Sequence, residues 1–237
     1  MLEKIKKKNI LLVYPNFPIP IKRKNHHDFL PIGLLKIGTY LRDSNGCKVK
    51  LIFGNEENNF TPDYILITSL FTYWSDCVHK TVNYYRNKYP AAHLIIGGIY
   101  ASLLPEHVHR ETNASVWKGL YYPAEEWCRV HDVDYSLLPE DIDFQILHGM
   151  RGCFRKCKFC GTWKIEPKEE FIDNIPSLVR KNHVIFYDNN FLRHPDVNQI
   201  LIDLSKIRIN GKKVIYESQS GFDGRIINAE IAVLLKK

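Results

Sequence analysis

Residues 144–160 read FQILHGMRGCFRKCKFC, and this stretch decides how the second half of the chain is interpreted. It begins with a short, largely apolar run at residues 144–149, which predicts a buried β-strand. Three cysteines then follow in the spacing Cys-x3-Cys-x2-Cys: Cys153, Cys157 and Cys160. A single helix or strand cannot bring such closely spaced thiols together. The pattern therefore predicts a loop after the strand that gathers the three thiols onto one compact metal centre.

Strands and helices alternate after the cysteines. Further strands are predicted at residues 183–187 and 213–217, and helices at residues 168–180 (interrupted near Pro176), 197–207 and 228–235. Such alternation is typical of a parallel sheet covered by helices. Three strand–helix units do not close a barrel, so we expect residues 144–237 to form an open, partial (β/α) unit.

The first half of the chain shows the same alternation. Strands are predicted at residues 9–14, 48–53, 64–69, 93–97 and 116–118, and helices at residues 31–43 and 75–89. We therefore expect residues 1–120 to form a Rossmann-like (flavodoxin-like) α/β domain, followed by a linker at residues 121–143 that contains Pro123 and Pro139. Ligands of such sheets bind beyond the carboxyl ends of the strands, which here precede residues 15–31, 69–74 and 97–104.

The composition is that of a globular protein, with 45% hydrophobic and 25% charged residues, and it excludes a disordered or collagen-like chain. No apolar run approaches the roughly 18 residues of a membrane span, and the first residues lack the apolar core of a signal peptide, so we expect a cytoplasmic protein. The net charge of +7 is dispersed, which favours a lysine-rich surface over a nucleic-acid groove. An RNA-modifying enzyme remains an alternative that predicts salt-dependent RNA binding.

The three clustered cysteines suit an iron–sulfur centre. Three thiolates leave one iron of a 4Fe–4S cluster without a protein ligand, and that iron is free to bind a substrate or cofactor. Structural zinc takes four ligands, and its fourth would have to be His148, His183 or a distant cysteine. We favour the cluster over zinc. The other cysteines, Cys47, Cys77 and Cys128, have apolar neighbours in the sequence and are interpreted as core residues.

Residues 151–160 (RGCFRKCKFC) resemble the signature of radical S-adenosylmethionine enzymes, including Phe159 before the last cysteine. The resemblance implies that Cys153, Cys157 and Cys160 hold a 4Fe–4S cluster whose open iron binds S-adenosylmethionine, with Phe159 near the adenine. It also implies reductive cleavage of S-adenosylmethionine, followed by hydrogen abstraction or radical methylation. The electron donor would be a ferredoxin or flavodoxin. Neither the substrate nor a catalytic residue is identified by the sequence.

Two later segments are similar to other parts of that family. Asp188, Asn189 and Asn190 follow the strand at residues 183–187, where the family has a motif that binds the methionine amino group, although Asp188 replaces the usual glycine. Gln219 and Arg225 follow the next strand, in a segment that looks like the one near the ribose or substrate. The alternatives are a turn-forming role for Asp188 and a surface charge for Arg225.

The first domain resembles the cobalamin-binding domain of one radical-enzyme subgroup. Its predicted contacts to the corrin and nucleotide tail are Thr68, Ser69, Gly97 and Gly98. The lower-ligand motif Asp-x-His-x-x-Gly falls on residues 28–33 with Leu30 in the histidine position, and His26 and His27 are out of register. The resemblance therefore implies cobalamin without a histidine ligand, and the alternative is a similar fold reused for substrate or packing.

The radical-enzyme barrel has later strands that finish its adenine site, and the sequence offers no match to them. We therefore expect a cobalamin-like domain followed by the N-terminal half of the barrel, with the activity of the chain alone in doubt. The alternative function is a noncatalytic fragment or binding module that holds an iron–sulfur centre or zinc.

Overall fold

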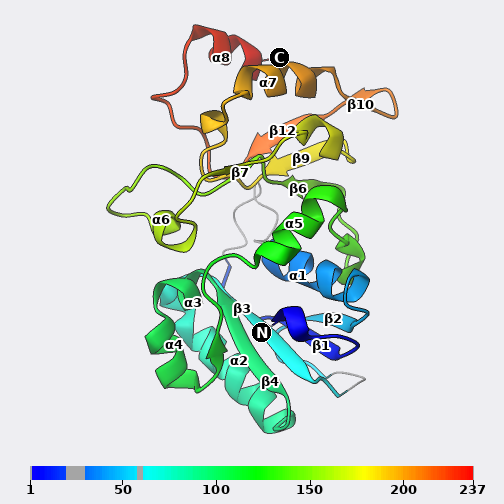
Figure 1. Ribbon diagram of the computed structural model, residues 1–237, viewed down its shortest axis with the longest axis vertical. Coiled ribbons are helices and arrows are strands. Elements are labelled where there is room, and N and C mark those ends of the chain that lie inside the picture. Colours follow the sequence, from blue (N-terminus) through cyan, green and yellow to red (C-terminus); the bar gives the residue numbers. More distant parts are fainter. Residues whose placement is uncertain (1, 20–29, 58–60, 237) are drawn as a thin grey trace. The chain divides into compact units, whose positions relative to one another are not determined.

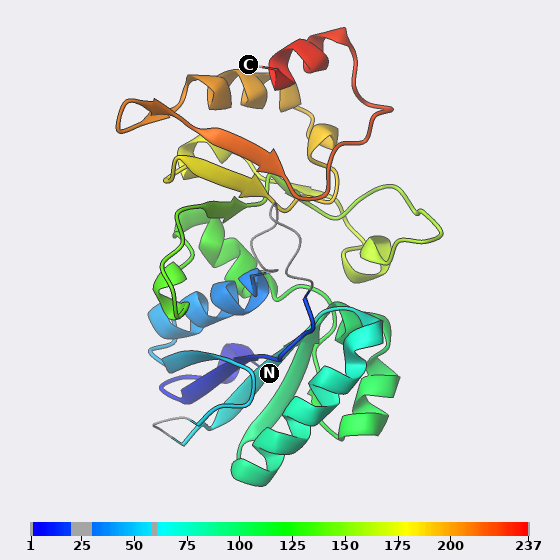
Figure 2. The ribbon, with the colours of Figure 1, turned by 180° about the vertical axis from the view of Figure 1, so that it is seen from behind.

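The structure is a computed structural model that describes residues 2–19, 30–57 and 61–236. The chain divides into two compact units, Met1–Glu140 and Asp141–Lys237. Figures 1 and 2 show the elements of each unit from two sides.

The first unit is built on a parallel sheet in the order β2-β1-β3-β4-β5. Its strands are β1 (Asn9–Tyr14), β2 (Lys48–Phe53), β3 (Tyr64–Ser69), β4 (His93–Gly98) and β5 (Ser115–Val116). The strand order reverses between β1 and β3, which is the arrangement of flavodoxin-like sheets and of their ligand-binding edge. The predicted Rossmann-like fold of this unit is confirmed.

Helices cover both faces of this sheet (Figure 1). The helices are α1 (Ile32–Asp43), α2 (Ser75–Lys88), α3 (Ile99–Leu103), α4 (Pro105–Thr112) and α5 (Tyr122–Val130), with short 3₁₀ turns η1 (Leu2–Lys4), η2 (Thr72–Trp74) and η3 (Tyr135–Leu137). Leu11 and Val13 of β1 share a core with α2, whereas Leu12 faces Gly38 of α1. Because both faces are buried, β1 is apolar along its length instead of alternating.

The expected linker at residues 121–143 is wrong for most of its length, because residues 121–140 belong to the first unit. Pro123 lies in the first turn of α5, where the missing N–H of proline costs no helical hydrogen bond. Helix α5 packs on α1 through a buried ion pair, in which Lys36 Nζ lies 2.6 Å from Glu125 Oε2. The proline that suggested a linker therefore starts a helix.

A hydrogen-bonded group of side chains ties α2, α3 and α4 together. The phenol oxygen of the buried Tyr100 lies 2.9 Å from His79 Nε2 and 2.6 Å from His107 Nδ1. One phenol proton serves two imidazoles, so one histidine accepts from the phenol while the other donates to it. This arrangement requires at least one neutral histidine.

The second unit contains a parallel sheet in the order β12-β9-β6. Its strands are β6 (Gln145–Leu147), β9 (His183–Phe186) and β12 (Ile215–Ser218), with the antiparallel pairs β7 (Met150–Arg151) with β8 (Glu170–Phe171), and β10 (Arg208–Ile209) with β11 (Lys212–Lys213). Its helices are α6 (Thr162–Ile165), α7 (Val197–Lys206) and α8 (Ala229–Leu235), with 3₁₀ turns η4 (Ile175–Leu178) and η5 (Phe191–Arg193). Val197, Ile200 and Leu204 form one buried face of α7, in a core that also contains Ile231 of α8.

The helix predicted at residues 168–180 is wrong. Glu170 and Phe171 form β8, whose partner β7 lies about 20 residues earlier in the chain. Asn174 then adopts a left-handed conformation with φ 61°, and Pro176 restricts the following residues to the short turn η4. Among the described residues, no helix has both the length and the apolar character needed to cross a membrane.

Candidate functional site

The cysteine loop of the second unit is held at the carboxyl edge of the β12-β9-β6 sheet. The strands are parallel, so the segments that follow β6, β9 and β12 meet at this edge. Hydrogen bonds join all three segments: Asp188 after β9 contacts the start of the loop, and Asp223 after β12 contacts Arg155 within it. The structure therefore brings the three segments singled out in the sequence together.

Asp188 fixes the entry to the cysteine loop. Its side chain is buried, and its carboxylate accepts hydrogen bonds from the backbone amides of Gly149 (2.9 Å) and Met150 (2.6 Å). These contacts link the segment after β9 to the chain that leaves β6. They also give Asp188 a structural role, while its predicted contact to a cofactor stays a prediction.

The base of the loop is fixed by Glu166. Its carboxylate accepts from Arg151 Nη2 at 2.7 Å and from the Gly152 amide at 2.7 Å, and only 11% of its side chain is exposed. Gly152 has φ 75°, and a Cβ atom there would lie 2.0 Å from the carbonyl oxygen of Lys168. Only glycine fits this turn into Cys153.

Within the cysteine loop, the sulfur of Cys160 makes hydrogen bonds with Thr162. Its Sγ lies 3.2 Å from Thr162 Oγ1 and 3.5 Å from the Thr162 amide nitrogen. The Thr162 hydroxyl also lies 3.3 Å from Asn189 Oδ1, and Asn189 Nδ2 donates to Glu166 Oε2 at 3.0 Å. A continuous set of hydrogen bonds thus runs from the sulfur to the base of the loop.

Two arginines meet at Asp223, next to the loop. Arg155 Nε and Arg225 Nε each lie 2.7 Å from a carboxylate oxygen of Asp223. The hydrogen bond from Arg225 lowers the pKa of Asp223 well below its usual range, and Arg155 adds to this effect. Asp223 raises the pKa of Arg225, and the electrostatic interactions of Arg225 with Cys157 and Cys153 raise it further. Cationic groups therefore accompany the thiols.

The three cysteines are free and half-buried. Within the described ranges, no group of three or more His, Cys, Asp or Glu side chains is gathered closely enough to hold a metal ion. Ligation by Cys153, Cys157 and Cys160 therefore stays a prediction, as does the zinc alternative. The ring of Phe159 is 94% exposed, and its predicted packing near an adenine is untested.

The remaining site residues of this unit lie at the same edge. Asn190 precedes η5 and is buried, and its Oδ1 has no hydrogen-bond partner among the described residues. The backbone N–H of Gln219 donates to the backbone carbonyl of Phe186 at 2.9 Å, which extends the pairing between β12 and β9. Arg225 is exposed apart from its contacts to Asp223.

The four residues predicted to contact cobalamin divide into two pairs. The hydroxyl of the buried Ser69 donates to the Gly97 carbonyl at 2.7 Å and accepts from the Ala101 amide at 3.0 Å, and a Cβ on Gly98 (φ 97°) would lie 2.2 Å from the Ser69 carbonyl oxygen. Ser69 and Gly98 therefore serve internal packing. The second pair is less constrained. A Cβ atom on Gly97 would lie 3.9 Å from its nearest neighbours, and Thr68, which pairs with Gly97 on the adjacent strand, is half-buried.

The remaining residues predicted for this unit fall into two groups. His26, His27 and Asp28 of the lower-ligand register lie outside the described residues. Burial raises the pKa of Cys128 to about 12, which keeps it a neutral thiol, and Cys47 is buried as expected of core residues.

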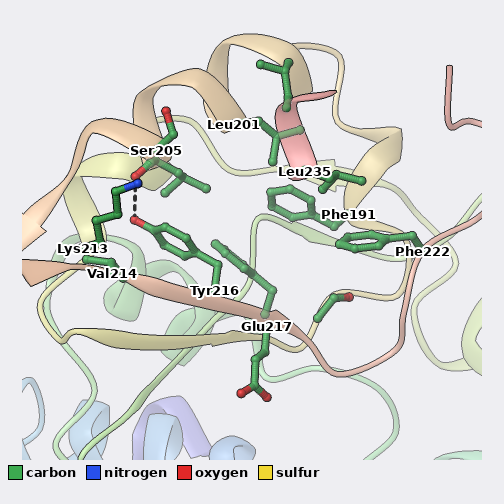
Figure 3. A pocket seen from close by; sticks show the side chains of 13 residues that line it. Phe191, Leu201, Ser205, Lys213, Val214, Tyr216, Glu217, Phe222 and Leu235 are labelled. Carbon is green, nitrogen blue, oxygen red and sulfur yellow. Dashed lines mark hydrogen bonds between the residues drawn. The ribbon is translucent and has the colours of Figure 1, made fainter. Parts of the chain in front are cut away.

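The second unit also contains a cavity of about 260 Å³ between the sheet and helices α7 and α8. Figure 3 shows its polar end, where Ser205, Lys213 and the Tyr216 oxygen lie, and its apolar end, lined by Phe191, Phe222 and Leu235. The Tyr216 hydroxyl donates to the Leu204 carbonyl at 3.0 Å. The cavity shares the segment after β12 with the cysteine site, because Phe222 precedes Asp223.

Glu166, Thr162 and Asp223 are the residues that sequence reasoning missed. No motif marks Glu166 or Thr162, and Asp223 lies within the segment 217–225, in which only Gln219 and Arg225 were predicted as site residues. Their roles come from contacts between distant segments, such as Arg155 with Asp223 across 68 positions.

Comparisons with known proteins include a structural likeness over part of the chain. No protein-family model and no curated protein matches the sequence. A solved structure titled as a novel cobalamin-binding protein from Desulfitobacterium hafniense DCB-2 is similar with a TM-score of 0.35 and 15% sequence identity. The likeness covers 51% of this chain and 56% of that chain, so it spans little more than half of either.

Proposed function

We propose that this chain is a radical S-adenosylmethionine enzyme that holds a 4Fe–4S cluster on Cys153, Cys157 and Cys160. Its reaction would be hydrogen abstraction or radical methylation of a substrate that remains unidentified. The observation that carries the proposal is the anchoring of the three-cysteine loop by the segments that follow the other two strands of the sheet, β9 and β12. Such anchoring suits a site whose sulfur atoms must be held in place.

The donor set fits a thiolate-ligated cluster. Three free thiols lie on one short loop, and a 4Fe–4S cluster held by these three alone would leave one iron without a protein ligand. Arg225 and Arg155 place positive charge beside a centre that carries negative charge. When bound, the reduced cluster supplies the electron that cleaves the carbon–sulfur bond of S-adenosylmethionine.

The residues of the chain have supporting tasks in this proposal. Asp188 and Glu166 hold the two ends of the loop, and they fix the path along which the cysteines are displayed. Asn189 lies between Glu166 and Thr162, so it joins the segment after β9 to the third cysteine. Arg225 would offset the negative charge of a cluster held by Cys153 and Cys157, with which it interacts electrostatically.

Anaerobic reconstitution with iron and sulfide tests the proposal. The protein should take up about four irons per chain and, after dithionite reduction with S-adenosylmethionine, should release 5′-deoxyadenosine. Cys157→Ala should lose the iron, and Cys77→Ala, which removes a thiol from the first unit, should keep it. Full iron content in Cys157→Ala, or zinc in place of iron in the wild type, would overturn the assignment. A cluster without 5′-deoxyadenosine would favour the noncatalytic metal-binding module.

We also propose that the first unit binds cobalamin at the carboxyl edge of its sheet, without a histidine ligand to cobalt. The surroundings of Gly97 favour a cobalamin site. A Cβ atom there would meet its nearest neighbours at 3.9 Å, so the packing does not require glycine at this position. A ligand that approaches the backbone closely would explain the glycine.

Titration with hydroxocobalamin, followed by absorbance, tests the cobalamin proposal. Gly97→Val should keep the fold and weaken cobalamin binding at least tenfold, since the new side chain occupies the space through which cobalamin would approach the backbone. Ala91→Val adds bulk near the opposite end of β4 and should bind as the wild type does. A spectrum of histidine-ligated cobalt, or equal binding by both variants, would contradict the proposal.

A further inference from the structure

We infer that the cavity of the second unit binds an aliphatic anion, whose apolar chain enters the cavity while its charged head lies beside Lys213. The cavity has a volume of about 260 Å³. One water molecule takes up about 30 Å³ of the liquid, and a methylene group is of similar size. A chain of about eight carbon atoms therefore fits the cavity, and a medium-chain carboxylate is the ligand class that we assign to it.

The inner wall of the cavity is apolar and belongs to the core of the unit. Phe186, Phe191 and Leu204 line it and are each at most 4% exposed. These side chains offer no hydrogen bonds, so the wall favours an apolar ligand. Phe222 also lines the cavity and is 44% exposed, so a chain bound there would cover part of its ring.

The hydroxyl groups at the polar end (Figure 3) already donate to the backbone. The Tyr216 hydroxyl donates to the carbonyl of Leu204 at 3.0 Å, and the Ser205 hydroxyl donates to the carbonyl of Ile202 at 2.7 Å. Burial raises the pKa of Tyr216 to about 12, so its phenol carries no negative charge that would repel an anion. Recognition of a ligand head at this end therefore depends on charge.

A cationic hairpin supplies that charge. Strands β10 and β11 are joined by Asn210 and Gly211, which both have positive φ, as a tight two-residue hairpin turn requires. The register of the hairpin places Arg208 directly opposite Lys213. Like charges in such positions destabilise an antiparallel pair, and an anion bound beside them would relieve the repulsion.

Lys213 is the cation of this pair that a ligand can reach. The Nη1 atom of Arg208 donates to the carbonyls of Ser205 and Ile207 at 2.8 Å each, so the guanidinium is engaged at the carboxyl end of α7. Lys213 is exposed and lines the cavity, and across residues 2–19, 30–57 and 61–236 it forms no ion pair. Its ammonium group is therefore available to the head of a bound anion.

The acidic residue at the cavity does not offset this charge. Glu217 is the acid among the described residues that line it, and its carboxylate lies 2.9 Å from His183 Nε2. In Figure 3 this carboxylate points away from the cavity. The charge presented to a ligand is thus positive, which selects an anionic head over a cationic one.

Titration calorimetry of the full chain with sodium octanoate, octanol and octylamine tests the class of ligand. Octanoate should bind with a Kd below about 1 mM, which is within reach of a ligand of this size, and more tightly than octylamine. Lys213→Met should weaken octanoate binding about threefold to tenfold and leave octanol binding within about twofold, because it removes only the charge. Lys212→Met is the matched control on the same hairpin, since Lys212 does not line the cavity, and it should bind both as the wild type does.

A second pair of variants tests the place of binding. Leu235 of α8 lines the cavity, so Leu235→Trp should fill it and abolish the binding of both octanoate and octanol. Val233→Trp is the control on the same helix, because Val233 is 59% exposed and does not line the cavity. Circular dichroism verifies the fold of each variant. Lys213 is exposed, so Lys213→Met decides the inference even if Leu235→Trp does not fold.

Octanoate binding that is weakened by Lys213→Met and lost in a folded Leu235→Trp supports the inference. Absence of octanoate binding to the wild type at millimolar concentration overturns it. Equal octanoate binding by Lys213→Met and wild type, or tighter binding of octylamine, overturns the anionic class. Binding that persists in a folded Leu235→Trp places the ligand outside the cavity and overturns the inference as well.

Discussion

Asp188→Ala is the substitution with the largest expected effect on the second unit. The change removes the acceptor of two buried backbone amides, those of Gly149 and Met150, at 2.9 Å and 2.6 Å. A buried donor left without a partner costs about 1–3 kcal/mol, so the variant should lose about 2–6 kcal/mol of unfolding free energy. Asp188→Asn keeps one acceptor oxygen and should lose about half as much.

Urea unfolding followed by far-ultraviolet circular dichroism measures the loss of stability. Hydrogen exchange of peptides that cover residues 144–152 locates it, since exchange there should accelerate more than in the first unit. Asp173→Ala is the control, because Asp173 is exposed and should change stability by no more than about 0.5 kcal/mol. If Asp188→Ala unfolds within about 1 kcal/mol of that control, the carboxylate does not hold the entry to the loop.

Two further predictions concern the first unit. Burial lowers the pKa of His79 from 6.5, and the nearby His107 adds to the shift, so the folded unit binds fewer protons than the unfolded chain. The stabilisation that neutral His79 gives the folded unit is complete above pH 6.5 and is lost as the pH falls below that value. The urea midpoint of unfolding should therefore drop on acidification, and it should drop less in His79→Gln. Gly98→Ala should cost more than about 3 kcal/mol, because it combines a left-handed conformation with a 2.2 Å approach to the Ser69 carbonyl oxygen. Gly97→Ala should stay within about 1 kcal/mol of the wild type in thermal unfolding, and equal losses in both glycine variants would contradict the distinction.

The sequence predicts those elements whose apolar pattern lies within one short segment of the chain. The run at residues 9–14 predicts β1 because a strand buried on both faces needs apolar residues at every position. The failures have long-range causes. Glu170 and Phe171 pair with Met150 and Arg151, and no local pattern shows this pairing. The helix α5 is hidden by Pro123, a residue that marks both linkers and helix starts.

The candidate site divides in the same way. The cysteine spacing is visible because three ligands of one centre lie on one loop, whereas their supports come from other segments. Asp188 acts on amides 38 and 39 positions away, and Glu166 joins Arg151 to Asn189. Glu166 looks like any surface acid in the sequence, and the sequence marks Asp188 only as a candidate cofactor contact. The supporting roles of both carboxylates are visible only in the folded chain.

Strand β12 has a consequence for how the second unit meets other chain segments. Among the described residues it pairs only with β9, and Ile215 on it is 63% exposed. Its outer side therefore presents backbone donors and acceptors in the register of a parallel ladder. Any strand that added there in parallel would end beside Gln219 and deliver its following residues toward the cysteine loop. We therefore expect that a strand added at this edge would bring the residues that follow it to the proposed reaction centre.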